Sequence, residues 1–69
     1  MTLPNYSRIK LISDAYVSLN ARRGAVGYVI EIYPDGHYEV EFSDTDGATT
    51  AQIVAREDEL EPFPEDRGV

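Results

Sequence analysis

Strict alternation of polar and apolar residues over residues 37–43, with turn residues on both sides, constrains the fold more than any other feature. The apolar parity is Tyr38, Val40 and Phe42, and the polar parity is His37, Glu39, Glu41 and Ser43. A β-strand directs successive side chains to opposite faces. The segment is therefore predicted to be a strand with one face in the core and one acidic face in water.

The flanking residues predict that this strand belongs to two hairpins. Pro34-Asp35-Gly36 precedes it, and this is the chemistry of a short hairpin turn with a glycine in the left-handed conformation. Asp44-Thr45-Asp46-Gly47 follows it and has the same character. On either side lie runs rich in β-branched and aromatic residues, Val26 to Tyr33 and Thr49 to Arg56, which we predict to be the partner strands.

The remaining segments complete an all-β pattern without any helical period. Residues 8–12 alternate like a half-buried strand, residues 14–20 read as a loop or short strand, residues 57–59 as one 3₁₀ turn, and residues 60–63 as an edge strand. Five short strands bury their apolar faces best by curling into a small barrel. The side chains predicted to lie inside are Val26, Ile30, Ile32, Tyr38, Val40, Phe42, Ile53 and Leu60.

Length and composition place this barrel in a single domain. The chain has 69 residues and no cysteine, so neither a disulfide nor a thiolate metal site is available. Residues 1–63 are expected to form the barrel and residues 64–69 a flexible tail. The first residues lack a basic segment followed by an apolar one, and no apolar run is long enough to span a bilayer. We therefore expect a cytoplasmic protein that does not contact membranes.

Two segments carry a resemblance to known proteins. Arg23-Gly24-Ala25-Val26-Gly27-Tyr28-Val29-Ile30-Glu31-Ile32-Tyr33, with Gly36 to Phe42, resembles the KOW-like pattern of SH3-like barrels. From Ile9 to Pro62 the chain is similar to a family of short bacterial proteins known only as a domain of unknown function. Ala25 and Tyr28 depart from that family, in which an acidic and a small hydroxyl residue are common at these positions. The resemblance implies a five-stranded SH3-like barrel and assigns no activity or site residues.

Catalytic and metal-binding arrangements find little support in the residues. His37 is the only histidine, and a cross-strand hydrogen bond explains it better than a metal site or a catalytic triad. The spacing of Asp44 and Asp46 fails the calcium-loop pattern, because Ala48 stands where an oxygen ligand is required. Glu39 and Glu41 share a strand face, which alternation alone explains. The sequence therefore predicts a protein that is not an enzyme and needs no cofactor or metal.

Charge provides the leading hypothesis for function. The chain has 6 basic and 13 acidic residues and a formal net charge of -7; residues 31–69 hold twelve of the acids and only two basic residues. Such an asymmetry serves solubility, or it attracts a basic partner. On the second interpretation the chain is a non-catalytic protein-binding module that acts as an antitoxin or inhibitor of a basic or nucleic-acid-processing protein. The partner-binding residues would be Glu31, Tyr33, Glu39, Glu41, Glu57, Asp58 and Glu59.

Two alternatives remain open at this point. The first is a nucleic-acid-associated KOW-like domain, in which a local patch would be formed by Arg8, Lys10, Arg22 and Arg23. The net charge opposes it, since long-range repulsion acts before the patch does. The second is a groove for proline-rich peptides built from tyrosines, which requires a cluster of at least three exposed tyrosine side chains. The oligomeric state is not predicted by the sequence.

Overall fold

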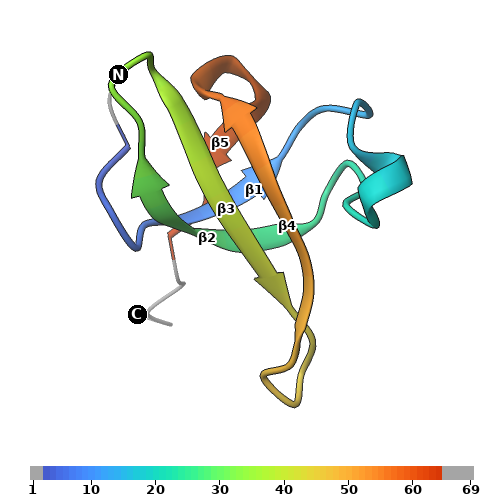
Figure 1. The fold of residues 1–69 in the computed structure, drawn as a ribbon. Helices are drawn as coiled ribbons and strands as arrows, with labels where there is room; N and C mark the ends of the chain where they lie inside the picture. The colour runs from blue at the N-terminus through green and yellow to red at the C-terminus, as the bar shows by residue number, and fades with distance from the viewer. Residues whose placement is uncertain (1–2, 65–69) are drawn as a thin grey trace.

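The computed structural model describes residues 3–64, which form a single antiparallel β-sheet with two short 3₁₀ helices (Figure 1). The elements in chain order are β1 (Arg8–Leu11), η1 (Val17–Leu19), β2 (Val26–Ile32), β3 (His37–Ser43), β4 (Thr49–Arg56), η2 (Glu57–Glu59) and β5 (Leu60–Pro62). The predicted bounds of β3, β4 and η2 are confirmed. The other three strands each end one residue earlier than predicted. Residues 14–20, predicted as a loop or short strand, form a loop that contains η1.

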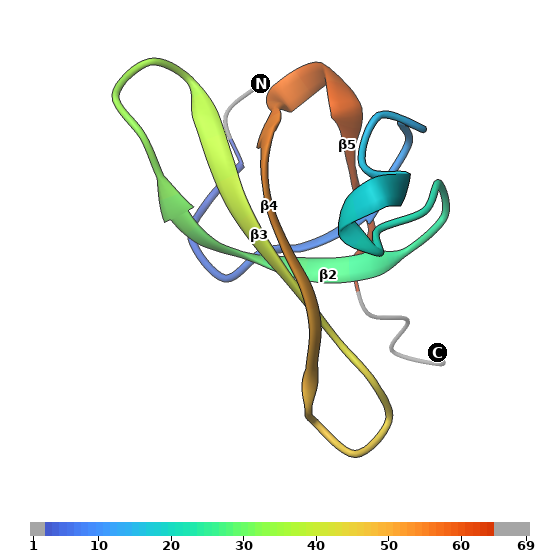
Figure 2. The same cartoon turned by 45° about the vertical axis from the view of Figure 1, so that its right-hand side comes forward.

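The five strands lie in the order β4-β3-β2-β1-β5, and each pair is antiparallel. Within residues 3–64 no ladder joins β4 to β5, so the sheet is not closed by strand pairing. The reason lies in η2, which carries the chain from the end of β4 across to the free side of β1 (Figure 2). The predicted tail at residues 64–69 lies outside the described residues except for Pro64.

All five strands contribute to one buried core. Its members are Leu3, Ile9, Leu11, Ala21, Val29, Tyr38, Val40, Phe42, Ala51, Ile53, Ala55 and Leu60. Five of the predicted core residues are among them, and Ile32 packs against the cluster from a partly buried position. Val26 and Ile30 are only partly buried, so their prediction as core residues was wrong.

A β-bulge in β2 explains this error. Val29 pairs with Val40 and Glu31 pairs with Glu39, which leaves Ile30 as an extra residue between two consecutive pairs. The bulge reverses the parity of the strand: Val29 points into the core before it, and Glu31 points outward after it. A bulge also bends its strand, and the bent β2 contacts β1 at one end and β3 over its length (Figure 1).

Both hairpin turns form as the sequence predicts. Gly36 has a φ of 91°, and its N–H donates to the carbonyl of Tyr33 (3.0 Å). At the second turn Asp44 Oδ1 accepts hydrogen bonds from the backbone N–H groups of Asp46 (2.9 Å) and Ala48 (3.0 Å). Asp44 is therefore a turn residue.

None of the helices in the described part of the chain is long and apolar enough to cross a membrane.

Candidate binding face

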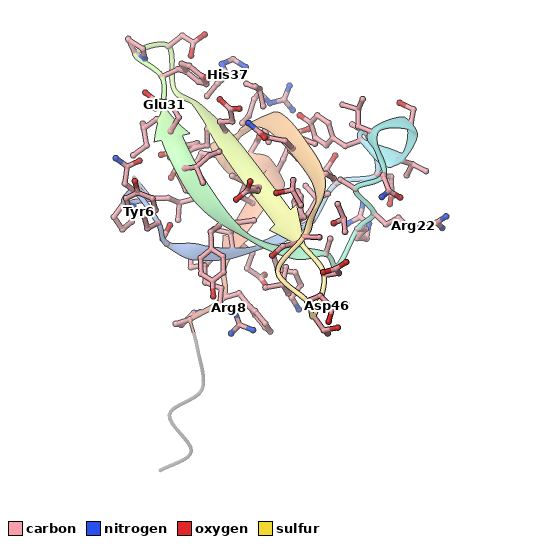
Figure 3. The ribbon with its side chains drawn as sticks, turned by 60° about the horizontal axis from the view of Figure 1, so that its bottom comes forward. Tyr6, Arg8, Arg22, Glu31, His37 and Asp46 are labelled. Atoms are coloured by element: carbon pink, nitrogen blue, oxygen red, sulfur yellow. The ribbon has the colours of Figure 1, made fainter. Side chains whose placement is uncertain are left out.

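Four of the predicted partner-binding residues gather on the outward face of β2 and β3. Glu31 and Glu39 are directly opposite each other in the β2–β3 ladder, and Glu41 lies two residues further along β3 on the same face. Tyr33 follows β2 and donates its hydroxyl hydrogen to Glu39. Figure 3 shows Glu31 and His37 near the tip of the β2–β3 hairpin, and Asp46 in the β3–β4 turn at the opposite end of β3. We call the set Glu31, Tyr33, Glu39 and Glu41 the acidic face.

Glu39 is the most strongly hydrogen-bonded carboxylate of the acidic face. Its two oxygens accept from the Tyr33 hydroxyl and from Nε2 of Gln52 on β4. These hydrogen bonds, the one from Tyr33 first, lower the pKa of Glu39 below its ordinary value. The same bond raises the pKa of the Tyr33 hydroxyl. Glu39 is therefore ionised and held in one orientation at neutral pH.

No basic side chain within residues 3–64 forms an ion pair with the acidic face. Glu41 accepts a hydrogen bond from Thr49 Oγ1 (2.9 Å), which leaves its charge uncompensated. Every ion pair between described residues involves an acid elsewhere, at Asp14, Asp35, Asp58, Glu59 or Glu61. Like charges directly opposite on neighbouring strands are unfavourable. The pairing of Glu31 with Glu39 is therefore electrostatically unfavourable.

Glu59, by contrast, faces the loop between β1 and β2. Its Oε1 accepts from the Tyr16 hydroxyl (2.5 Å) and the Arg56 backbone N–H (2.9 Å), and its Oε2 from Ser13 Oγ (3.3 Å). Partial burial raises the pKa of Glu59, but these hydrogen bonds outweigh it and leave the pKa below the ordinary value. Burial and the bond to Glu59 raise the pKa of Tyr16 to about 12. Glu59 thus joins η2 to the β1–β2 loop.

Asp58 and Glu57 are the other two acids of η2. Asp58 Oδ1 accepts from Nε of Arg56 (3.2 Å), so its charge is paired. Glu57 begins η2, and its carbonyl accepts from the backbone N–H of Leu60, which ends it. The structure therefore brings together Glu31, Tyr33, Glu39 and Glu41, whereas the carboxylates of Asp58 and Glu59 are held by other partners.

Sequence reasoning missed three neighbours of the acidic face. Tyr28 on β2 is paired with Glu41, and Gln52 on β4 is paired with Glu41 from the other side. Val54 is paired with Glu39, and 48% of it is exposed. The alternation of β4 contained the signal: once the turn sets the β3–β4 register, the polar parity of β4 must lie beside Glu39 and Glu41.

The four basic residues do not form one patch. Arg8 and Lys10 point outward from β1, with their charged groups 5.0 Å and 4.8 Å from the centroid of the Phe63 ring. Arg23 lies in the β1–β2 loop, where it binds Asp14 (3.1 Å) and the carbonyl of Ile12 (2.8 Å). Figure 3 shows Arg8 and Arg22 far apart.

Other chemistry also lacks a site in the described residues. Nδ1 of His37 lies 3.1 Å from Asp35 Oδ1 within the turn, instead of making the predicted cross-strand bond. Residues 3–64 contain no group of three or more side chains placed to hold a metal ion, and their surface has no pocket. Of the tyrosines, only Tyr6 and Tyr28 are largely exposed, which is fewer than a peptide groove built from three would need.

Fold and face together define a small all-β domain whose acidic face has no ion pair with a basic side chain of the described residues. Residues 6–62 match DUF4926, a domain of unknown function, and the chain belongs to this family. No curated protein and no solved structure shows significant similarity to the chain.

Proposed function

We propose that this chain is a non-catalytic protein-binding module that binds a basic segment of its partner through the acidic face. The observation that carries the proposal is the convergence of Glu31, Glu39 and Glu41 without a basic partner among the described residues. Carboxylates without a basic partner attract a cationic protein over long range and increase its association rate. An antitoxin or inhibitor of a nucleic-acid-processing protein is the role that fits, because carboxylates can occupy a site that otherwise binds phosphate.

The finer fold that we propose is an SH3-like barrel. Two features support it although β4 and β5 are not paired. The bulge at Ile30 bends β2 and increases its twist, as small barrels require. Side chains from all five strands enclose one core, so the open edges of the sheet curl around a common centre.

A triple variant of the acidic face tests the function. E31Q/E39Q/E41Q removes three charges with little change in side-chain shape. Binding to a candidate basic partner, or to the lysine peptide described below, is measured by fluorescence anisotropy at moderate salt, for this variant and for its control alike. We expect at least a tenfold loss of affinity, mainly through slower association.

The matched control is D46N/D58N/E61Q, which changes the net charge by the same amount at positions outside the acidic face. If the proposal holds, this control binds within about twofold of the native chain at moderate salt, because distant exposed charges are screened there. Equal losses in the two triple variants would mean that only net charge matters, and the acidic face would not be a binding site.

Nucleic-acid binding is the second candidate, and one specific observation supports it. Arg8 and Lys10 share an outward face with the Phe63 ring, an arrangement that suits phosphates and a stacked base. Lys10 is also within 3.9 Å of Glu61, which reduces the charge available. With only these two residues in place, we rank this function below protein binding.

A further inference from the structure

The two edges of the sheet differ in how they are protected. β5 has only three residues, which include Glu61 and Pro62. A short strand, a charged side chain and a proline each disfavour the addition of another strand at an edge. β4 has eight residues, with neither proline nor a charged side chain before Arg56. A long, uncharged edge strand is a template for pairing with another chain.

The direction of the hydrogen bonds shows which residues of β4 are open. The carbonyl of His37 accepts from the N–H of Tyr33 (2.9 Å), so His37 directs its backbone toward β2. The direction of the backbone N–H and C=O groups alternates along a strand. Those of Tyr38, and of every second residue after it, therefore point toward β4. Their partners point back toward β3, and these are Ala51, Ile53 and Ala55. The N–H and C=O groups of Gln52 and Val54 are therefore directed away from the sheet.

Two hydrogen bonds at the ends of β4 agree with this assignment. The carbonyl of Thr50 accepts from Nδ2 of Asn20 (3.1 Å), and the N–H of Arg56 donates to Glu59 (2.9 Å). Both residues have the same parity as Gln52 and Val54, and both direct these groups outward. The two bonds therefore mark the ends of the open edge, within which no described residue is paired with the outward groups of Gln52 and Val54.

We propose that an extended basic segment of a partner protein adds to β4 as a sixth, antiparallel strand at Gln52 and Val54. This inference rests on the proposed function and specifies its binding mode. In an antiparallel pair, the residues opposite Gln52 and Val54 hydrogen-bond to them and place their side chains on the same face. That face contains Glu39 and Glu41, which lie one strand further in.

Charge decides the kind of segment that fits. Side chains of the added strand would start about 10 Å from β3, two strand spacings away, a distance that a lysine or arginine and a glutamate span together. Alternate basic residues would therefore reach Glu39 and Glu41. A second copy of the chain would instead bring two molecules of net charge -7 together, with two acidic faces side by side.

The probe is a fluorescein-labelled peptide, Thr-Lys-Thr-Lys-Thr-Lys-Thr, with blocked ends. V54P removes one outward N–H and leaves the bonds to β3 in place, since proline is tolerated where the N–H faces away from the sheet. V54A is the matched control, because it removes apolar surface and keeps the N–H. We expect V54P to weaken binding at least tenfold and V54A to remain within about threefold.

N-methylated peptides test the same bonds with the native chain, so the result does not depend on V54P folding. Methylation of the backbone nitrogens of the lysines, whose N–H groups would face β4, should weaken binding at least tenfold. Methylation of the backbone nitrogens of the threonines, whose N–H groups would face water, should change the affinity little. Equal binding of the two methylated peptides would overturn strand addition.

The outcomes separate the binding mode from the function. If E39Q/E41Q weakens peptide binding while V54P binds like the native chain, the acidic face binds its partner without strand addition, and this inference fails alone. If the native chain does not bind the peptide, or E39Q/E41Q binds it unchanged, the proposed function fails as well. A native dimer in sedimentation that V54P converts to monomer would assign the edge to a second copy and overturn the proposed partner.

Discussion

Gly27 occupies a position where even one methyl group has no room, and this provides a sharp test of the packing. A Cβ atom at Gly27 would lie 2.6 Å from the carbonyl oxygen of Glu41, and 2.7 Å and 2.9 Å from Cδ1 and Cε1 of the Phe42 ring. The carbonyl belongs to the β2–β3 ladder and the ring to the core, so neither can move alone. Gly27→Ala must therefore separate β2 from β3 locally.

Overpacking of a core by such a group costs about 1–3 kcal/mol, and we expect the upper part of this range because a backbone atom is involved. At about 4–8 °C per kcal/mol for a domain of this size, a loss of about 3 kcal/mol lowers Tm by about 12–24 °C. The assay is urea and thermal unfolding followed by far-ultraviolet circular dichroism, with tyrosine fluorescence as a second probe.

Two further variants identify the cause of the loss. Gly36→Ala is the control: nothing lies within 4 Å of its Cβ, and its φ of 91° makes the cost purely conformational, about 1–2 kcal/mol. Phe42→Leu should recover part of the loss in the Gly27→Ala background, because it removes the ring atoms and leaves the carbonyl clash. If Gly27→Ala costs no more than Gly36→Ala, or if Phe42→Leu is simply additive with it, the steric explanation is wrong.

Three other predictions concern hydrogen bonds and charge. Glu59→Gln should destabilise the fold by about 1.5 kcal/mol at pH 7. Because the pKa of Glu59 is lowered in the folded state, this difference in stability should shrink as the pH falls below the ordinary value of 4.5. A difference in urea unfolding that does not depend on pH would contradict the prediction. Tyr38→Phe leaves the buried N–H of Leu3 without its acceptor at 3.1 Å, so unfolding free energy should fall by about 1–2 kcal/mol and amide exchange at Leu3 should accelerate. On duplex DNA, any binding through Arg8 and Lys10 alone should give a salt slope of about −1.8, whereas a slope near −3.6 would show that four basic residues act together.

The hairpins were predictable because their residues agree at every level. In β3 the alternation, the turn glycine before it and the aspartate turn after it all specify one strand, and its observed bounds match. The β2 strand was different, since Val26 to Ile32 is apolar at almost every position and contains no alternation to fix its parity. The bulge at Ile30 depends on how β2 meets β3, which is a tertiary property that local sequence does not encode.

The candidate site was likewise predictable from the sequence only in part. Glu39 and Glu41 could be placed on one face from strand periodicity alone, and the structure adds Glu31 opposite Glu39. The acids of η2 looked equivalent in the sequence, but a charged run does not indicate which side chains turn inward. Glu59 turns inward because its carboxylate caps η2 and binds Tyr16, 43 residues away along the chain. Such contacts depend on topology and lie beyond pattern reasoning.

Tyr28 lies between a basic and an acidic side chain on the outward face of the sheet, and this position connects the two candidate functions. Tyr28 is paired with Arg8 on β1 and with Glu41 on β3, and 46% of it is exposed. A partner docked on either side can therefore use its ring as apolar contact area, while the charges beside it select the partner. Tyr28→Ala should weaken both kinds of binding, so it cannot distinguish them. Charge variants on the two sides can: loss of a basic ligand with E41Q, and not with R8Q, would assign the face to a protein partner.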